Sequence, residues 1–247
     1  MINIQDNIAE ISVGNISIGS AYVGNQLVWQ KGEIVYDNDQ NAYMVKNYVT
    51  AKGYYSFATT PITGKSTDLL ELGVTITART TEGYCWLVGY YSSESNRFGI
   101  YIRHSSNRWT FDFWRGGSGS SRKKSSVTPA LNRRYDLIVG NTSLTETNTA
   151  YAYDKAGNTT IVAEGTAINT TTSSLHYILS ENRSGKPNTI ANYHYLKIYK
   201  QEVSGEPKVL VLDWIPVQSV SDGTWGFYDR ITHNFYPSEG TEEFTGG

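Results

Sequence analysis

Alternation of apolar and polar residues recurs along the chain, broken by short polar turns. LGVTITART (72–80) puts Val74, Ile76 and Ala78 on one side of an extended segment and threonines on the other. YCWLVGYY (84–91) is apolar on both sides, as in a central strand. The pattern continues to KVLVLDWIPV and predicts about ten strands between Thr75 and Val217, spaced as in an all-β sandwich.

A helical period is hard to find. DLLEL (68–72) allows one helical turn, but its neighbours TGKST and GVTIT break that turn off. Nor do strands alternate with helices, as parallel sheets require. The chain is therefore predicted to be all-β, with antiparallel sheets.

The first 31 residues follow a different rhythm. In ISVGNISIGSAYVGN (11–25) each five-residue unit ends in a Gly-Asn or Gly-Ser pair. A period of five residues matches neither a helix nor a strand. Such pairs turn the chain, and short extended pieces of this kind are marginal when isolated. We expect residues 1–31 to be an anchoring or oligomerisation arm and 32–247 to be the domain. The arm would bury a set of apolar side chains against the domain or another chain: Val13, Ile18, Tyr22, Val23 and Trp29.

The chain is nearly neutral and rich in aromatic residues. The 247 residues carry a net charge of -2, with 19 Tyr, 7 Phe and 6 Trp. This balance gives no electrostatic reason to expect nucleic acid, and no stretch is long and apolar enough for membrane insertion. The single cysteine, Cys85, is expected to be a buried, inert thiol, and the N-terminus does not resemble a signal peptide.

Tests for catalytic chemistry fail. A glycosidase needs two carboxylates facing one cleft, whereas Asp112 stands alone between two phenylalanines and Glu242 and Glu243 point to opposite sides of an extended segment. The four histidines are scattered, with His194 expected on a strand surface, and no nucleophile motif accompanies them. We therefore assign no catalytic residue and do not expect an enzyme.

One segment suggests a metal. YDNDQNAY spaces Asp37, Asp39 and Asn41 like the start of a calcium loop. Ala42 stands where that loop needs glycine and Tyr48 where it needs glutamate. A polar turn is the favoured interpretation, and we expect neither metal nor cofactor.

Binding remains, and the aromatic residues are its candidates. Exposed rings on a sheet would suit stacking against sugars, although for any single ring a core position is the better expectation. The glycan-binding candidates are Trp109, Trp114, Tyr90 and Tyr101.

The C-terminal third carries a resemblance. It contains Tyr195-Leu196-Lys197-Ile198-Tyr199, Leu212-Asp213-Trp214-Ile215-Pro216-Val217, Gly226-Phe227-Tyr228-Asp229-Arg230 and Gly240-Thr241-Glu242-Glu243-Phe244. These pieces resemble the end of a concanavalin-A-like (laminin-G-like) jelly-roll module found in tailed-phage and prophage virion proteins and in surface proteins of gut bacteria. AYVGNQLVWQKG (21–32) is similar to a segment of phage tail and virion-surface proteins.

The tail also permits two local predictions. Asp229 and Arg230 suit a turn between FYDRI and NFYPS, with an ion pair between them fixing it. Phe244 is expected to tuck under the sheet.

The resemblance implies a two-sheet jelly roll on a virion surface, made in the host cytoplasm. It implies a structural component of a head or tail fibre or appendage, with a lectin-like domain for host glycan attachment. The arm would bind capsid or tail proteins or copies of itself, with a homotrimer as the expected oligomer. The alternative is a bacterial surface or secreted carbohydrate-binding module. A third hypothesis is that the chain is a glycosidase, which the missing carboxylate pair opposes.

Overall fold

The computed structural model describes the 247-residue chain except for sixteen gaps. These are residues 1–10, 14–15, 19, 24–25, 31, 66–67, 80–83, 94–95, 106–107, 116–122, 126–127, 141–149, 156–158, 166–171, 180–188 and 202–205. Some further side chains, including all those before residue 32, also lie outside the description.

The described chain is all-β, as predicted. The first strands are β1 (Ile11–Val13), β2 (Ile16–Ile18), β3 (Ser20–Val23), β4 (Gln26–Gln30), β5 (Ile34–Tyr36), β6 (Ala42–Val45), β7 (Val49–Ala51), β8 (Ala58–Lys65), β9 (Leu69–Arg79), β10 (Tyr84–Ser93) and β11 (Asn96–Ser105). The others are β12 (Arg108–Arg115), β13 (Lys123–Lys124), β14 (Arg134–Gly140), β15 (Ala150–Asp154), β16 (Thr159–Gly165), β17 (Thr172–Leu179), β18 (Thr189–Lys200), β19 (Val209–Ser219), β20 (Trp225–Asp229), β21 (Phe235–Pro237) and β22 (Thr245–Gly246). Among the described residues the only helix is the single 3-10 turn Gly53–Tyr55, so none there is long and apolar enough to cross a membrane.

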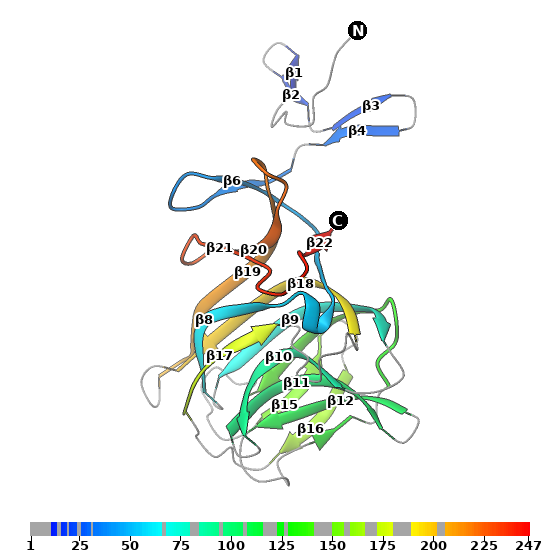
Figure 1. Ribbon diagram of the computed structural model, residues 1–247, viewed down its shortest axis with the longest axis vertical. Coiled ribbons are helices and arrows are strands. Elements are labelled where there is room, and N and C mark those ends of the chain that lie inside the picture. Colours follow the sequence, from blue (N-terminus) through cyan, green and yellow to red (C-terminus); the bar gives the residue numbers. More distant parts are fainter. Residues whose placement is uncertain are drawn as a thin grey trace.

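Two antiparallel sheets make up the domain (Figure 1). The small sheet has the order β13-β12-β11-β10-β17-β8. The large sheet has the order β16-β15-β14-β9-β18-β19-β20-β21; in addition β7 pairs with β18 and β22, and β6 joins β5 to β19. DLLEL is not a helical turn: β9 begins at Leu69, because this apolar run pairs with β14 and β18 on either side.

The two sheets pack on one shared core, as an all-β sandwich requires. Alternation decides which residues enter it: of the three residues that the sequence placed on one side of this strand, Val74 and Ile76 are fully buried, whereas Ala78 is half-buried. The largest buried side chains come from both sheets and from Phe244 before β22. Those from the sheets are Trp214, Tyr90, Tyr135, Tyr177, Tyr193, Phe98, Phe111, Phe113 and Phe227.

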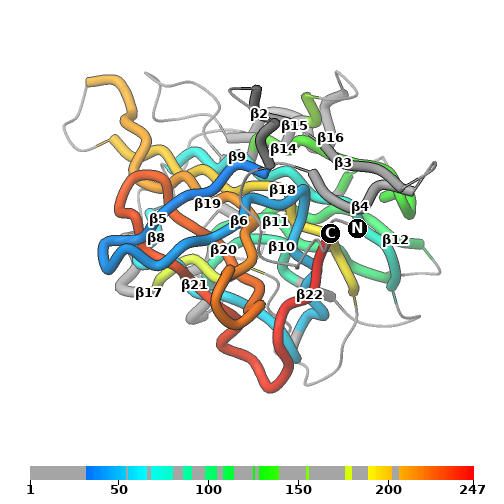
Figure 2. The backbone as a smooth tube through the Cα atoms, turned by 90° about the horizontal axis from the view of Figure 1, so that it is seen from above, coloured from blue at the N-terminus to red at the C-terminus, as the bar shows by residue number. Residues whose placement is uncertain are grey.

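The large sheet curls at one end around a second, smaller core. This core contains Tyr43, Ile215, Val217 and Tyr228, from β6, β19 and β20. Figure 2 shows β5 and β6 beside β19 and β20 in this region. The curl is closed where the β5–β6 loop meets the β20–β21 loop, through a hydrogen bond from the Asn38 backbone N–H to the His233 backbone oxygen at 3.2 Å.

The C-terminal segment closes the sandwich. Phe244 is 1% exposed and packs edge-on against Phe227 with ring centroids 5.6 Å apart, which confirms the predicted tuck. The turn after β20 is built differently from the prediction. The Asp229 carboxylate accepts bonds from the backbone N–H groups of Asp213 and Ile231 and from the Thr232 hydroxyl, whereas Arg230 pairs with Glu33 at 3.2 Å.

Strands β1 and β2 form one hairpin and β3 and β4 another, and neither hairpin joins a larger sheet among the described pairings. In the first hairpin Ile11 pairs with Ile18 and Val13 with Ile16, while serine pairs with serine. The side chains predicted to anchor the arm lie outside the description, and so does that of Cys85.

Candidate functional site

The four predicted glycan-binding aromatics do not form one cluster. Tyr90 lies in the shared core at 1% exposure, against Phe98 and Tyr177. That core position leaves Tyr90 no face for a sugar. Trp114 pairs with Gly99 in the strand register, but its side chain lies outside the description.

Trp109 closes one end of the sandwich. Its ring is half-buried at the margin of the core, with the Arg79 guanidinium 5.2 Å from the ring centroid. The His104 ring lies 5.2 Å from it, centroid to centroid. Because Arg79 belongs to the large sheet and Trp109 to the small one, this cation–π contact joins the two sheets.

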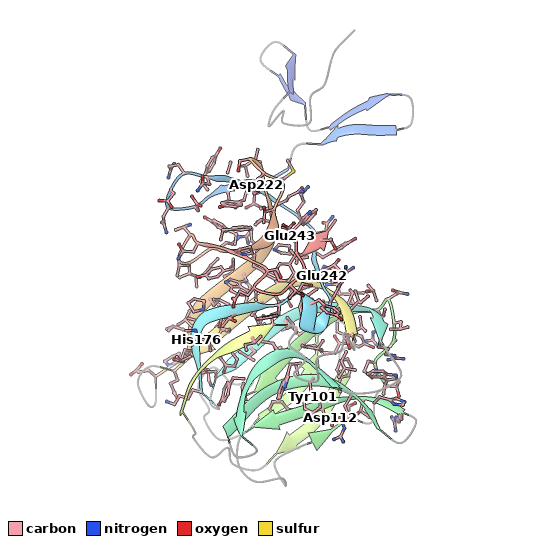
Figure 3. The ribbon with its side chains drawn as sticks, viewed as in Figure 1. Tyr101, Asp112, His176, Asp222, Glu242 and Glu243 are labelled. Atoms are coloured by element: carbon pink, nitrogen blue, oxygen red, sulfur yellow. The ribbon has the colours of Figure 1, made fainter. Side chains whose placement is uncertain are left out.

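Tyr101 lies on the other surface of the small sheet, which we call the small outer face. Ile100 and Ile102 point into the core, so alternation turns Tyr101 outward. It pairs with Trp86 on one side and Asp112 on the other, and the rings of Tyr101 and Trp86 are 4.9 Å apart. Figure 3 shows Tyr101 and Asp112 together, well separated from Asp222, Glu242 and Glu243.

Two glycines shape the small outer face. Gly89 and Gly99 pair directly across β10 and β11, and the Trp86 indole lies over both. A Cβ on Gly89 would come within 2.6 Å of this indole, and Gly99 has a φ of +141° that side chains rarely adopt. The glycines therefore allow the indole to lie close to the sheet.

The small outer face is nevertheless closed. Trp86 and Tyr101 are each 4% exposed, and Asp112 is fully buried. The Thr110 hydroxyl donates to Asp112 Oδ1 at 2.6 Å, a charge-assisted bond that helps the carboxylate tolerate burial. This face has the side chains of a sugar site but not the accessibility of one.

The opposite surface of the sandwich, which we call the large outer face, is partly open. Tyr195 on β18 is half-buried, and its ring lies over Gly73 of β9, where a Cβ would come within 2.6 Å of Tyr195 Cε1. The Tyr195 hydroxyl is hydrogen-bonded to Asp136, and burial together with that carboxylate raises the pKa of Tyr195. The Tyr195 ring therefore lies flat over a glycine, with polar groups beside it.

Charged groups surround this ring. Arg134 donates to Asp136 Oδ1 through Nε at 3.2 Å and Nη2 at 3.0 Å. Glu71 accepts from Lys155 at 3.3 Å, and Lys197 lies 3.7 Å from Asp213. Of these groups Asp136, Glu71 and Arg134 act electrostatically on Tyr195, so both signs of charge lie near its ring.

A hydroxyl and an imidazole meet beside Tyr195. The distance from Thr75 Oγ1 to His194 Nε2 is 3.0 Å, and from His194 Nδ1 to the Asn47 backbone oxygen it is 2.9 Å. His194 is half-buried on a strand surface, as predicted. Sequence reasoning missed this pair because the two residues are 119 positions apart.

A buried carboxyl lies between the sheets. Asp68 is fully buried, accepts from the Tyr177 hydroxyl at 2.9 Å, and lies 3.6 Å from Lys200 Nζ. Burial raises the pKa of Asp68 to about 6, although the Lys200 charge opposes the shift. Among the described residues its Oδ1 has no hydrogen-bond partner.

The suspected calcium segment is a turn, as the favoured interpretation predicted. The Asp37 carboxylate accepts bonds from the backbone N–H groups of Asp39 and Asn41, from the Asn41 amide and from the Tyr43 hydroxyl. Those hydrogen bonds lower the pKa of Asp37, that of the Asn41 side chain most of all. Asp37 therefore orders the β5–β6 loop through these hydrogen bonds.

No protein-family model and no curated protein matches the chain. A solved structure that it resembles is the crystal structure of Scytalido-glutamic peptidase with a peptide-based transition-state analogue. The two are 12% identical with a TM-score of 0.30, and the match covers 78% of this chain and 98% of the peptidase. The expectation that the chain is not an enzyme is contradicted by this neighbour, and we do not retain it. A likeness this distant carries no argument for peptidase chemistry here.

Proposed function

We propose that this chain is a phage virion protein of a head or tail fibre or appendage, whose jelly-roll domain attaches the particle to host cell-surface glycans. The proposal is supported by the sequence resemblance over the C-terminal third and by the two-sheet architecture. One observation carries its binding component: the Tyr195 ring on the large outer face.

Sugar recognition needs an aromatic ring for the apolar face of the pyranose and polar groups for its hydroxyls. Tyr195 supplies the ring, and Gly73 beneath it keeps the ring flat on the sheet. Asp136 and Glu71 offer acceptors and Arg134 a donor at the rim. On the small outer face, by contrast, the matching ring and carboxylate are buried.

The binding test is a polysaccharide panel from host strains, read by immobilised-glycan binding of the full chain. Tyr195→Ala should weaken binding by about tenfold or more, the loss expected for removing one central aromatic contact. Tyr195→Phe keeps the ring and should bind nearly as the wild type. Tyr36→Ala is the matched control, because Tyr36 is 54% exposed on the distant strand β5. Equal binding by Tyr195→Ala and wild type would refute this site.

We further propose that residues 1–31 join the domain to other virion proteins or to its own copies, with a trimer as the expected assembly. The first hairpin pairs Ile11 with Ile18 and Val13 with Ile16, and a two-stranded hairpin of this kind is marginal alone. Light-scattering mass of the full chain and of residues 32–247 tests this. A monomer in both cases would contradict it.

A further inference from the structure

The hydrogen atoms between Thr75 and His194 can be assigned from chemistry. The Asn47 backbone oxygen only accepts, so the His194 Nδ1 that lies 2.9 Å from it carries the hydrogen. In the neutral imidazole Nε2 is then the acceptor. The Thr75 hydroxyl, 3.0 Å from Nε2, must donate to it.

The charge state of the ring agrees with this assignment. Burial lowers the pKa of His194 and is the largest contribution; the hydrogen bond to the Asn47 backbone opposes it, the nearby Arg134 charge adds to it, and Asp136 opposes it least. The imidazole is therefore neutral near pH 7 and free to take a proton. A hydroxyl donating to a base that a third group orients is the arrangement of an activated nucleophile.

The strand beside Thr75 carries a cation. Arg134 on β14 pairs with Thr75 on β9 in the strand register. Its Nε and Nη2 donate to Asp136, which fixes the guanidinium, and the charge of Arg134 acts on His194. A fixed guanidinium there can stabilise negative charge that develops on a substrate oxygen.

We propose that Thr75 and His194 form a nucleophile–base pair that hydrolyses acyl esters, and that the natural substrate is an O-acylated sugar bound at Tyr195. Only the sugar in this statement rests on the proposed function, since the ester chemistry needs no glycan. Thr75 and His194 touch the reacting atoms, and Arg134 is the oxyanion donor.

Water is the only reagent that the reaction needs besides the ester. Thr75 Oγ bonds to the ester carbonyl carbon while its proton passes to His194 Nε2. The carbon–alkoxide bond then breaks, and the leaving alcohol takes the proton from Nε2. Water attacks the acyl-threonine, again giving its proton to Nε2, and the acid leaves as Thr75 regains its hydrogen. The orienting group is a neutral carbonyl, so we expect slow turnover.

The test uses the full chain and p-nitrophenyl acetate. His194→Gln should lower kcat/KM by about a hundredfold, the usual contribution of general base catalysis. Thr75→Val removes the nucleophile and should lower it at least as much. Thr75→Ser keeps the hydroxyl and should stay active. Thr77→Val is the matched control, because the Thr77 hydroxyl on the same strand donates to the Ile190 backbone oxygen instead.

Two further readouts separate catalysis from folding. The rate should rise with pH through an inflection below 6.5, as the neutral form of His194 becomes populated. Mass spectrometry of the quenched reaction should find one acetyl group on Thr75. Wild-type hydrolysis no faster than the blank, or undiminished hydrolysis by Thr75→Val, would overturn the proposal.

The same variants test the glycan proposal independently of the ester chemistry. Loss of ester hydrolysis in Thr75→Val with unchanged polysaccharide binding would support two functions on one face. Ester hydrolysis by a wild type that binds no polysaccharide would keep the pair and remove the sugar substrate.

Discussion

On both outer faces of the sandwich an aromatic ring lies over glycine, but only one of the two rings is accessible. On the small outer face the Trp86 indole lies over Gly89 and Gly99, and on the large outer face the Tyr195 ring lies over Gly73. Both rings have a carboxylate beside them, Asp112 for the Trp86–Tyr101 pair and Asp136 for Tyr195. Trp86 is 4% exposed, whereas Tyr195 is only half-buried. Burial, rather than residue type, separates the closed cluster from the accessible ring.

The largest expected effect is at the ring of the closed face. Trp86→Ala should lower the free energy of unfolding by about 3–5 kcal/mol, because it empties a buried site. Tyr195→Ala should cost about 1 kcal/mol, as a partly exposed position does. Urea denaturation of both variants measures the difference. Similar losses would break the comparison.

The next effect concerns the carboxyl between the faces. Burial raises the pKa of Asp68 to about 6 from 3.8, so the folded chain binds this proton more tightly than the unfolded chain does. The resulting stability is complete below pH 3.8 and is lost as the pH rises through 6, a change of about 3 kcal/mol. Urea unfolding at several pH values should show this slope in the wild type.

Two variants should change the pH dependence of stability in different ways. Asp68→Asn removes the titrating group and should flatten the slope. Lys200→Met removes the charge that opposes the shift, so it should move the inflection to higher pH. A slope that is unchanged in Asp68→Asn would assign it to another group.

The glycines beneath the rings allow a smaller, paired test. Gly99→Ala should cost about 1–3 kcal/mol through its backbone conformation alone, and its Cβ would also meet the Val88 backbone oxygen. Gly73→Ala meets mainly the Tyr195 ring, which is partly exposed and can shift. We expect about 1 kcal/mol or less there, by thermal denaturation. A larger loss at Gly73 would mean that the large outer face is as rigid as the small one.

The smallest effect is at the rim of the open face. Lys155 pairs with Glu71 at 3.3 Å, with side chains 48% and 19% exposed. Lys155→Ala should change stability by less than about 1 kcal/mol, since solvent and salt screen such pairs. A denaturation midpoint that shifts by several times this amount would show that the rim is structural.

The sequence predicted those parts of the fold that depend on local pattern. Alternation identified Val74 and Ile76 as core residues, and the run YCWLVGYY as a strand apolar on both sides; β10 indeed places Leu87 and Val88 in the core and Trp86 on the outer face. The sequence left DLLEL open because a short apolar run fits a helical turn as well as a buried strand. Only pairing with β14 and β18 decides between them.

The candidate sites could not be predicted in the same way. Tyr90 and Tyr101 are both aromatic strand residues, and the sequence does not say which faces the core. The Thr75–His194 pair depends on β9 lying beside β18, a contact between distant parts of the chain. One signal was available, because NYHYLKIY alternates His194 with aromatic rings. The β18–β9 register shifts between Tyr193 and Tyr195, so His194 has no partner in that ladder, and only its side-chain contact identifies Thr75 as its neighbour.

The strand order has a consequence for how the protein is made. Strand β18 lies between β9 and β19 in the large sheet, and β17 lies between β10 and β8 in the small one. While the ribosome is still completing the last third of the chain, the earlier strands present open edges and an uncovered core. The sandwich cannot close until β17, β18 and β19 emerge, so folding during synthesis is delayed and non-local. The interval before they emerge is when this chain is most prone to aggregate, and when a chaperone would help it most.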